Sequence, residues 1–322
     1  MRAATIVDGR VEVRDHPDPV PGWGQLLVRV RAAGLNGADL IQVAGHYPAP
    51  PGSPPDIPGL ELAGEVDSVG PGVTRFAPGD RVMAVVGGGG QAELAVIGER
   101  EAMPVPTGTS WEEAGGFPEV FTTAHDALCS QAGLATGERL LVNGAAGGVG
   151  TAGVQIGLVC GATVTASVRS PQRREDVVGL AGDAGARFGA LAVVDPAEVA
   201  DRGPYDVILE LVGAPNLPTD LAALATGGRI AVIGTGAGSR AEIDLGLLMR
   251  ARGRIHGSTL RARPSEAKAA AARAVEAHVL PHLAAGRARV PVCATFPLSE
   301  APDAYERFAA GAKFGKVVLV AG

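Results

Sequence analysis

The chain has 322 residues, of which 46% are hydrophobic and 19% are charged, with a formal net charge of only −6 at pH 7. This composition is typical of a well-packed protein of about two domains. No long basic run is present, which argues against nucleic acid or an anionic membrane as a partner, and no apolar stretch reaches the ~18 residues of a membrane span. Residues 1–8 lack the apolar core of a secretory signal, so we expect a cytoplasmic enzyme.

Three cysteines, Cys129, Cys160 and Cys293, are odd in number and far apart in the sequence. This pattern fits neither a disulfide framework nor a zinc site built from paired cysteines. We therefore predict that they are buried small hydrophobic residues.

Residues 1 to about 100 contain short β-branched runs that are separated by Gly and Pro. The runs are 11–13, 25–30, 62–69 and 81–86. This spacing is typical of an all-β barrel. The proline-rich segment 47–58 cannot continue a helix or a central strand, so we expect an ordered loop of the kind that often borders a site.

From about residue 120 the pattern changes to alternating strands and helices. Six strands are predicted, at 140–143, 162–167, 191–194, 205–212, 229–234 and 254–257. The alternation predicts a parallel sheet with helices on both faces, which is the doubly wound Rossmann arrangement of an α/β protein.

The first of these strands runs into a glycine-rich turn, residues 144–150, which is followed by an apolar helix. Glycines at 144 and 147 allow unusual backbone angles and the close approach of a ligand, and Gly150 lets the helix pack tightly. The exposed amide groups and the helix dipole favour a pyrophosphate at this turn. The motif alone is weak, but its place after the first of six strands strengthens the interpretation.

The C-terminal part of the chain resembles residues 1 to about 100 in its sequence pattern. It contains an Ala-rich helix at 264–285, a strand at 292–298, a short helix at 299–310 and a last strand at 316–320. We predict that the chain returns to complete the barrel. The expected domains are therefore 1–120 with 262–322, and a dinucleotide-binding domain at 121–261.

Five further motifs accompany the glycine turn, at residues 34–39, 45–47, 58–61, 87–93 and 315–319. Together they resemble the medium-chain dehydrogenase/reductase superfamily, and within it the zinc-free, zeta-crystallin-like quinone oxidoreductases. The resemblance covers essentially the whole chain. It implies a GroES-like catalytic domain beside the Rossmann domain.

The resemblance also bears on zinc, which part of the superfamily uses to polarise an alcohol oxygen. Where the zinc branch carries a cysteine this chain has Asn36, where it carries a histidine this chain has Leu60, and near the second cysteine position it has Glu119. Only Glu61 remains, and a single acid does not hold a metal. We expect no metal, and a structural role for Glu61.

Without a metal, hydride from a nicotinamide must add directly to an electron-poor acceptor, such as a quinone or an alkene conjugated to a carbonyl. The protein then has to supply orientation, a donor near the developing oxyanion and a proton source. The resemblance suggests Asn36, Tyr47 and Asp39 as catalytic candidates. Tyr47 is equally interpretable as a packing residue against the cofactor, and Asp39 as a residue that fixes its loop.

Cofactor choice is read at the end of the second Rossmann strand, where an acidic residue would select NAD. Here Ser167 is followed by the basic segment 168–174, which favours the 2′-phosphate of NADPH, although Asp195 stands where close relatives often have a tyrosine. The predicted cofactor-binding residues are Thr123, Gly144, Ala146, Gly147, Gly148, Val149, Gly150, Ser167, Arg169, Ser170, Arg173, Gly234, Arg261 and Lys316.

The sequence therefore predicts a zinc-independent, NADPH-dependent reductase of quinones or related conjugated carbonyls. The resemblance implies a homodimer in which the sixth strand pairs with its counterpart, with several arginines around it. Two alternatives are an enoyl reductase, for which secondary metabolism is one setting, and a dinucleotide-binding structural or regulatory protein with little turnover.

Overall fold

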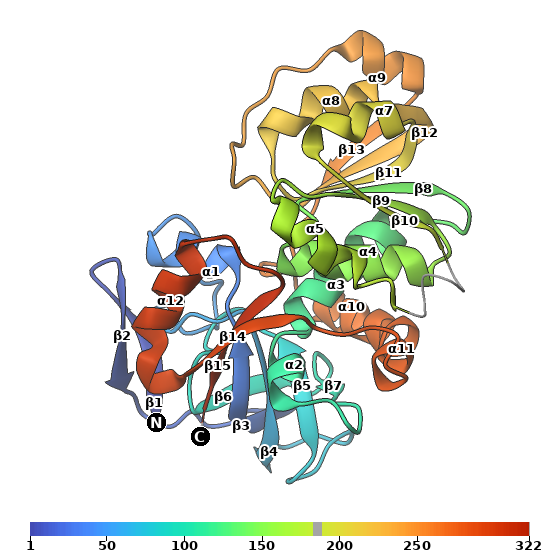
Figure 1. Cartoon of the computed structure of the whole chain (residues 1–322). Helices are drawn as coiled ribbons and strands as arrows, with labels where there is room; N and C mark the ends of the chain where they lie inside the picture. Colours follow the sequence, from blue (N-terminus) through green and yellow to red (C-terminus); the bar gives the residue numbers. More distant parts are fainter. Residues whose placement is uncertain (183–188, 322) are drawn as a thin grey trace. The chain divides into compact units, whose positions relative to one another are not determined.

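The computed structural model describes residues 1–182 and 189–321. The chain forms two compact units. Unit 1 consists of Met1–Thr122 and Leu260–Gly322, and unit 2 consists of Thr123–Thr259. Figure 1 shows the elements of both units.

Unit 2 is built on a parallel sheet. Its strands are β8 (Arg139–Asn143), β9 (Thr163–Ser167), β10 (Leu191–Val194), β11 (Tyr205–Glu210), β12 (Leu224–Val232) and β13 (Arg254–Gly257). Within the described residues their order is β10-β9-β8-β11-β12-β13, and every pairing is parallel. The order reverses between β8 and β11, where a doubly wound sheet opens a crevice for its ligand. The predicted Rossmann arrangement is confirmed.

Helices cover both faces of this sheet, with α4 on one face and α8 and α9 on the other (Figure 1). They are η1 (Asp126–Gln131), α4 (Gly148–Val159), α5 (Pro171–Val178), η2 (Pro196–Glu198), α7 (Val199–Arg202), η3 (Ala214–Asn216), α8 (Leu217–Ala222) and α9 (Leu245–Ala251). The glycines of α4 let it approach the sheet closely. An added Cβ at Gly153 would lie 2.7 Å from Leu209 Cδ2, and one at Gly157 would lie 2.5 Å from Leu140 Cδ2.

Unit 1 contains a branched sheet and a separate hairpin. The hairpin pairs β1 (Arg2–Val7) with β2 (Arg10–Asp15), and the sheet comprises β3 (Gln25–Gly34), β4 (Glu61–Val69), β5 (Arg81–Val85), β6 (Leu94–Gly98), β7 (Met103–Pro104), β14 (Val292–Pro297) and β15 (Lys316–Val320). Strand β3 organises the sheet because it pairs with β4, β6 and β15. Its inward side chains, with those of β4 and β5, form an apolar core that includes Leu26, Val28, Leu62 and Val82.

The helices of unit 1 are α1 (Gly37–Val43), α2 (Trp111–Gly115), α3 (Pro118–His125), which crosses into unit 2, α10 (Ser265–His278), α11 (Leu280–Ala284), η4 (Leu298–Glu300) and α12 (Ala301–Ala309). The last helix packs beside β2 and β15 (Figure 1). Its side chains Tyr305 and Phe308 are three residues apart and therefore share one face, where they join Val317 and Leu319 in a second core.

Some predicted boundaries were wrong. The single helix expected at 264–285 is two helices, α10 and α11, because Pro281 lacks the N–H that a continuous helix would need and lies instead in the first turn of a new helix that begins at Leu280. Strand β12 starts at Leu224 rather than at residue 229. The helix α1 and the strands β1, β6 and β7 had no counterpart in the sequence prediction.

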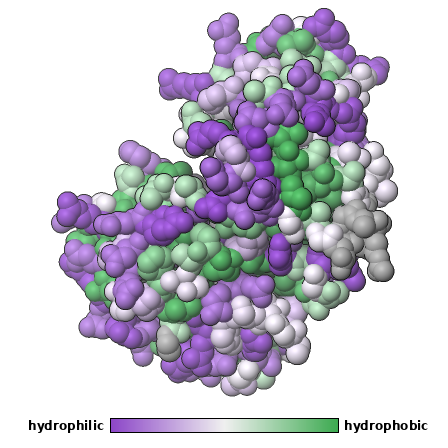
Figure 2. Space-filling view, in the orientation of Figure 1, coloured by the Kyte–Doolittle hydropathy of each residue, from purple (hydrophilic) through white to green (hydrophobic). Residues whose placement is uncertain are grey.

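The prediction of three buried cysteines was also wrong. Cys129 and Cys160 are half-buried, and Cys293 is exposed. Hydrophilic residues cover much of the surface seen in Figure 2, with smaller hydrophobic patches among them, as is usual for folded proteins. Among the described helices, none is both long and apolar enough to cross a membrane.

Candidate active site

The glycine turn of unit 2 joins β8 to α4. Gly144 has φ +73°, a left-handed conformation that favours glycine. A Cβ at Gly150 would lie 2.4 Å from the carbonyl oxygen of Gly144, so a side chain there would collide with the turn itself. At Gly147 the nearest atom to an added Cβ is 3.6 Å away, which leaves room outside the turn. A side chain at position 147 would therefore fit without a clash, whereas one at position 150 would not.

Three buried polar side chains lie where the strand order reverses. Asn143 ends β8 and Glu210 ends β11, and the amide of Asn143 donates to Glu210 Oε2 (2.7 Å) and to Asp220 Oδ1 (2.8 Å). Glu210 Oε1 accepts the N–H groups of Val212 (2.5 Å) and Gly213 (2.6 Å). Glu210 thereby fixes the turn after β11.

Asp220 is the acid of this cluster whose pKa is raised. Its Oδ2 atom is buried without a hydrogen-bond partner in the part of the chain that the structure describes. Burial and the neighbouring Glu210 together raise the pKa of Asp220 to about 8. Asn143, Glu210 and Asp220 were missed in the sequence, where the available signal was a polar residue closing each of two apolar strands.

The turn held by Glu210 contacts the glycine turn directly. A Cβ at Gly144 would lie 3.3 Å from Val212 Cγ2 and 3.5 Å from Leu211 Cβ. The predicted residue Gly234 also belongs here, since a Cβ at that position would lie 2.2 Å from the carbonyl oxygen of Leu211. The backbone that follows β8 and β12 thus requires glycine at two positions, Gly144 and Gly234.

The predicted phosphate-binding residues lie at the end of β9 and the start of α5. Ser167 is buried at the strand end, and its carbonyl oxygen accepts the N–H of Ala145 (3.2 Å). Ser170 donates to Gln172 Oε1 (3.0 Å), and Arg173 is paired with Asp176 (2.9 Å). These local partners reduce what Ser170 and Arg173 can offer a ligand.

The other two arginines of this segment differ in their partners. Arg174 donates to the carbonyl oxygen of Val168 (3.0 Å) and is paired with Asp195. Arg169 is exposed, and no ion pair to it is found within residues 1–182 and 189–321. Among the described residues, Arg169 is therefore the arginine of this segment that has no acidic partner.

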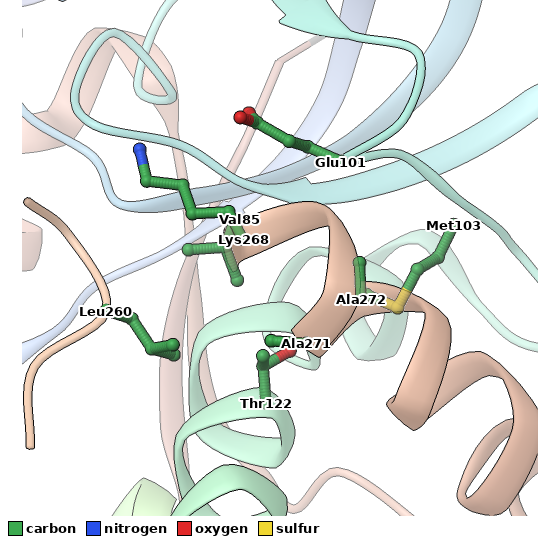
Figure 3. A pocket seen from close by; sticks show the side chains of 8 residues that line it. All are labelled: Val85, Glu101, Met103, Thr122, Leu260, Lys268, Ala271 and Ala272. Atoms are coloured by element: carbon green, nitrogen blue, oxygen red, sulfur yellow. The ribbon is translucent and has the colours of Figure 1, made fainter. Parts of the chain in front are cut away.

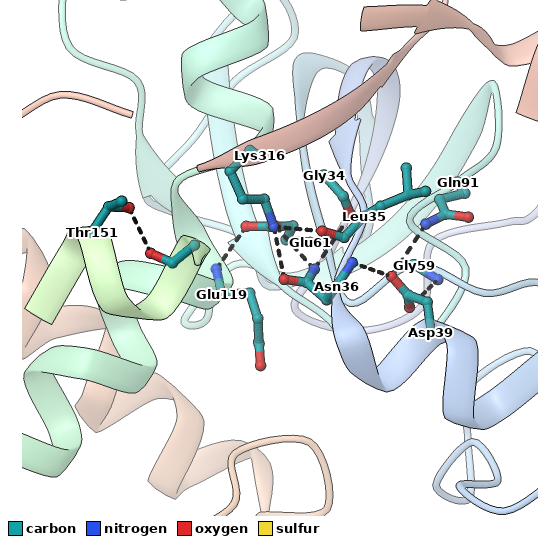
Figure 4. A network of polar contacts seen from close by, with 11 residues as sticks. Gly34, Leu35, Asn36, Asp39, Gly59, Glu61, Gln91, Glu119, Thr151 and Lys316 are labelled. Carbon is teal, nitrogen blue, oxygen red and sulfur yellow. Dashed lines mark hydrogen bonds and ion pairs between the residues drawn. The ribbon is translucent and has the colours of Figure 1, made fainter. Parts of the chain in front are cut away.

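A buried ion pair dominates the polar interior of unit 1. Lys316 Nζ lies 2.5 Å from Glu61 Oε1, and the two side chains are 2% and 0% exposed. Lys316 also donates to the carbonyl oxygen of Leu35 (2.8 Å) and to Asn36 Oδ1 (2.7 Å), as Figure 4 shows. All three ammonium hydrogens are used inside the protein. This arrangement does not fit the expected role of Lys316 as a cofactor ligand.

Asn36 belongs to the same network. Its amide nitrogen donates to Glu61 Oε1 (3.0 Å) and to the carbonyl oxygen of Gly34 (3.3 Å). Both amide hydrogens are therefore occupied, so this geometry does not present Asn36 as a donor to a substrate oxyanion. The side chain instead connects β3 to β4.

Asp39 fixes two loops. Its Oδ2 atom accepts the N–H of Asn36 (2.8 Å) and the amide of Gln91 (3.4 Å), and Oδ1 accepts the N–H of Gly59 (3.2 Å) (Figure 4). Burial raises the pKa of Asp39 to about 6, against the lowering effect of these donors and of Lys316. The contacts favour the loop-fixing interpretation over a catalytic one.

Tyr47 is half-buried at the start of the proline-rich loop, and Arg261 holds it. The Arg261 guanidinium lies over the tyrosine ring, 4.8 Å from its centroid, and donates to the Tyr47 carbonyl oxygen (2.8 Å). It also donates to Gly87 O (2.8 Å) and Gln42 Oε1 (2.6 Å). Burial raises the pKa of Tyr47, so the phenol is protonated at neutral pH.

Arg261 is itself only 3% exposed and belongs to unit 1. Its contacts make it a clamp on the loop of Tyr47. Of the remaining predicted residues, Thr123 is buried in α3, whereas Ala146, Gly148 and Val149 lie partly exposed at the glycine turn and the start of α4.

The residues around Glu61 do not fit a zinc ion. Glu61 Oε1 is occupied by Lys316 and Asn36, and Oε2 accepts the N–H of Glu119 (2.8 Å). No group of three or more His, Cys, Asp or Glu side chains within the described ranges could hold a metal ion. Both oxygens of Glu61 are therefore engaged by protein donors instead of being open to a zinc ion.

Unit 1 also contains a small, mainly apolar pocket. Its lining consists of Val85, Glu101, Met103, Thr122, Leu260, Lys268, Ala271 and Ala272 (Figure 3). None of the predicted site residues lines it. The pocket and the polar network of Asn36, Asp39, Glu61 and Lys316 in Figure 4 therefore share no residue.

Two family models match the chain. Residues 22–132 match the alcohol dehydrogenase GroES-like domain, and residues 188–319 match the zinc-binding dehydrogenase model. The chain is 32% identical over 315 residues to a quinone oxidoreductase from Lama guanicoe, covering 94% of this chain and 90% of that protein. It is 30% identical over 350 residues to an acryloyl-coenzyme A reductase from Metallosphaera sedula, covering 98% and 99%.

Solved structures and longer proteins match as well. A quinone oxidoreductase structure from Pseudomonas syringae aligns over 99% of this chain and 100% of that chain, with 26% identity and a TM-score of 0.83. Polyketide synthases from Streptomyces halstedii and Streptomyces orinoci also match, at 40% and 33% identity, but the chain spans only 4% and 13% of their lengths.

The parallel sheet of unit 2 and its glycine turn have the arrangement of a dinucleotide-binding fold, and unit 1 accompanies them. The chain belongs to the medium-chain dehydrogenase/reductase superfamily, and quinone oxidoreductases are among its relatives. The resemblance drawn from the sequence motifs and the predicted GroES-like and Rossmann fold class are confirmed.

Proposed function

We propose that this protein is a zinc-independent, NADPH-dependent oxidoreductase that transfers hydride to quinones or related conjugated carbonyls. The observation that carries the proposal is the hydrogen bonding of the Glu61 carboxylate. Both of its oxygens are engaged by protein donors, one of them a lysine ammonium, so the site has an internal cation and no ligand set for a metal. An acceptor must then be reducible without metal polarisation, as quinones and enones are.

The residues of unit 2 fit a dinucleotide. We assign the pyrophosphate to the turn and first helical residues Gly144, Ala146, Gly147, Gly148, Val149 and Gly150, where the N–H groups of α4 are open. NADPH supplies the hydride when it is bound. Arg169, supported by Ser167, Ser170 and Arg173 around it, provides positive charge for the 2′-phosphate.

Tyr47 is the proposed proton donor. Its phenol is protonated at neutral pH, and Arg261 holds both its ring and its backbone. Three other predicted residues have a positioning role and do not contact the substrate: Asn36, Asp39 and Lys316. Their polar atoms keep β3, α1 and the loop at Gly59 in place.

An enoyl reductase is the second candidate. The protonated, clamped Tyr47 favours it, because reduction of a C=C bond requires a proton in addition to hydride. The relative named acryloyl-coenzyme A reductase supports this candidate, since an acryloyl thioester has a C=C bond conjugated to a carbonyl.

Turnover separates these functions. Oxidation of NADPH should be measured with 1,4-benzoquinone and with acryloyl-coenzyme A, before and after treatment with a chelator. We expect quinone turnover that survives chelation, with no stoichiometric zinc by metal analysis. One zinc per chain, with activity lost on its removal, would overturn the mechanism. Cofactor binding without turnover of either acceptor would instead favour a structural or regulatory protein.

Replacing Tyr47 by Phe tests the proton donor. The change removes the hydroxyl and keeps the ring over which Arg261 lies. We expect enoyl reduction to fall by ~10²-fold or more, whereas quinone reduction should change much less, because its product oxyanion can take a proton from water.

Tyr205→Phe is the matched control. The hydroxyl of Tyr205 donates to the carbonyl oxygen of Val199 inside unit 2 (2.9 Å), so its loss should affect stability but not the ratio of the two activities. If Tyr47→Phe keeps both activities, Tyr47 is a packing residue.

A further inference from the structure

Two cysteines from different elements of unit 2 lie in contact. Cys129 is on η1, and Cys160 is the C-terminal cap of α4. Their Sγ atoms are 3.8 Å apart, although the residues are 31 positions apart in the sequence. Both side chains are half-buried, so small reagents can reach them.

We infer that Cys129 and Cys160 are a redox-modification site, a dithiol that a hydroperoxide converts into an intramolecular disulfide. The contact provides the essential condition, since two sulfur atoms that already touch need only a small approach to bond. Cys293 is exposed in unit 1 and has no part in this pair.

The two cysteines differ in the pKa of their thiols, so they have different roles in the reaction. The hydrogen bond with Cys129 lowers the pKa of Cys160 to about 7, while the same contact and burial raise the pKa of Cys129. The thiolate of Cys160 is thus the attacking group at neutral pH.

The chemistry balances with one equivalent of peroxide. The Cys160 thiolate attacks a peroxide oxygen, the O–O bond breaks, and Cys160 becomes a sulfenic acid while the leaving oxygen departs as water or an alcohol. The sulfur of Cys129 then attacks the sulfenic sulfur and releases water as the S–S bond forms. Two thiols are oxidised and one peroxide is reduced.

The position of the pair predicts its effect. Helix α4 has 12 residues, so at ~1.5 Å per residue its C-terminal cap lies ~18 Å from the glycine turn at its other end. A disulfide there would tie η1 to α4 without touching the cofactor site. We expect higher thermal stability of the oxidised protein and NADPH affinity within twofold of the reduced protein.

The test uses the whole protein, treated with one to a few equivalents of hydrogen peroxide. Thiol titration of the unfolded protein should fall from three groups per chain to one, and peptide mass spectrometry should find residues 129 and 160 joined in one molecule. The melting temperature should rise by several degrees and return after dithiothreitol.

Three single variants complete the design. Cys293→Ser should fall from two thiols to none and keep the stability shift. Cys129→Ser and Cys160→Ser should each lose both the cross-linked peptide and the shift. The inference is overturned if the wild-type protein keeps three titratable thiols, if peroxide yields only stable oxyacids of single cysteines, or if the cross-link joins two chains. The wild-type measurements decide the question even where a serine variant folds poorly.

Discussion

Arg169 stands apart from its neighbours at the end of β9, because Arg173 and Arg174 have acidic partners in Asp176 and Asp195. Charge-assisted bonds to a phosphate contribute about 1.5–3 kcal/mol. Arg169→Ala should therefore weaken NADPH binding roughly tenfold or more and leave NADH nearly unchanged. Dissociation constants for both cofactors, measured at low and high salt, check this result, and added salt should reduce the wild-type preference.

Arg174→Ala provides the comparison for Arg169, since it removes a cation of the same segment that is already paired with Asp195. It should affect both cofactors to a similar extent. A wild-type preference for NADPH that survives in the double variant Arg169→Ala with Arg173→Ala would show that other residues recognise the phosphate.

Asp220 makes stability depend on pH. Its folded pKa of about 8 is raised from 3.8, so the folded state holds a proton that the unfolded state has lost between these values. The stabilisation is complete below about pH 3.8 and is lost as the pH rises through about 8, with a limiting slope of roughly 1.4 kcal/mol per pH unit. Asp220→Asn, which imitates the protonated acid, should flatten this dependence.

Urea denaturation of the wild type and of Asp220→Asn at several pH values measures the difference. The variant should gain stability relative to the wild type as the pH rises from 5 to 8. Parallel curves for the two proteins would mean that Asp220 is ionised in the folded state.

The roles of some residues could be predicted from the sequence and those of others could not, depending on whether the role rests on local or on long-range contacts. The roles of Gly144 and Gly150 follow from local backbone geometry, which a short motif encodes. The partners of Lys316 do not, because Glu61 lies 255 positions away in the sequence and is reached only through the pairing of β15, β3 and β4. Asn36 was therefore predicted as a catalytic residue and Lys316 as a cofactor-binding residue, whereas in the fold both side chains make their hydrogen bonds to other groups of the protein.

At the scale of elements, two glycines of the turn between β8 and α4 have different roles: Gly150 is needed for stability, and Gly147 is expected to matter for cofactor binding. Gly150→Ala would place a methyl group against the backbone of Gly144 and Ala145, at 2.4–2.6 Å, and should cost about 1–3 kcal/mol of stability together with cofactor affinity. Gly147→Ala meets nothing closer than 3.6 Å. It should leave stability nearly intact and weaken NADPH binding, because its methyl group occupies the ligand's space.

Thermal unfolding and NADPH titration of both variants test this distinction. Equal loss of stability in the two variants would show that Gly147 serves the turn, and unchanged NADPH affinity in Gly147→Ala would place the pyrophosphate elsewhere. Wild-type protein with and without NADPH sets the scale of the ligand's own stabilisation.

Elements with a strong apolar period were predicted well, and short ones were not. Strands β8, β10 and β11 contain continuous apolar runs, at 140–142, 191–194 and 207–209, which is how strands covered on both faces appear in a sequence. Helix α1 has seven residues and buries two polar ones, Asp39 and Gln42, so its pattern lacked the apolar stripe that marks a helix. Tertiary hydrogen bonds, rather than local preference, hold it in place.

For the whole molecule we propose a homodimer through the edge of the unit 2 sheet. Strand β13 is terminal in the strand order within the described residues, and Leu245 and Met249 on the adjoining α9 are 62% and 76% exposed. A terminal strand and exposed apolar side chains in the same unit favour pairing with a second copy. Sedimentation should give twice the 32.4 kDa of one chain, and Met249→Lys should shift it toward the monomer. A single-chain mass at micromolar concentration would contradict the proposal.

The buried pair of Lys316 and Glu61 also has a consequence for the order of biosynthesis. A ribosome makes Glu61 early, but Lys316 appears only after all of unit 2 has been synthesised. Until then Glu61 lacks the cation that it faces in the finished fold, and a carboxylate is costly to bury alone. We therefore expect this part of unit 1 to stay open to water in the nascent chain while unit 2 already has every strand that it needs. The inserted unit is then able to fold first, and the unit whose two segments flank it in the sequence is completed last.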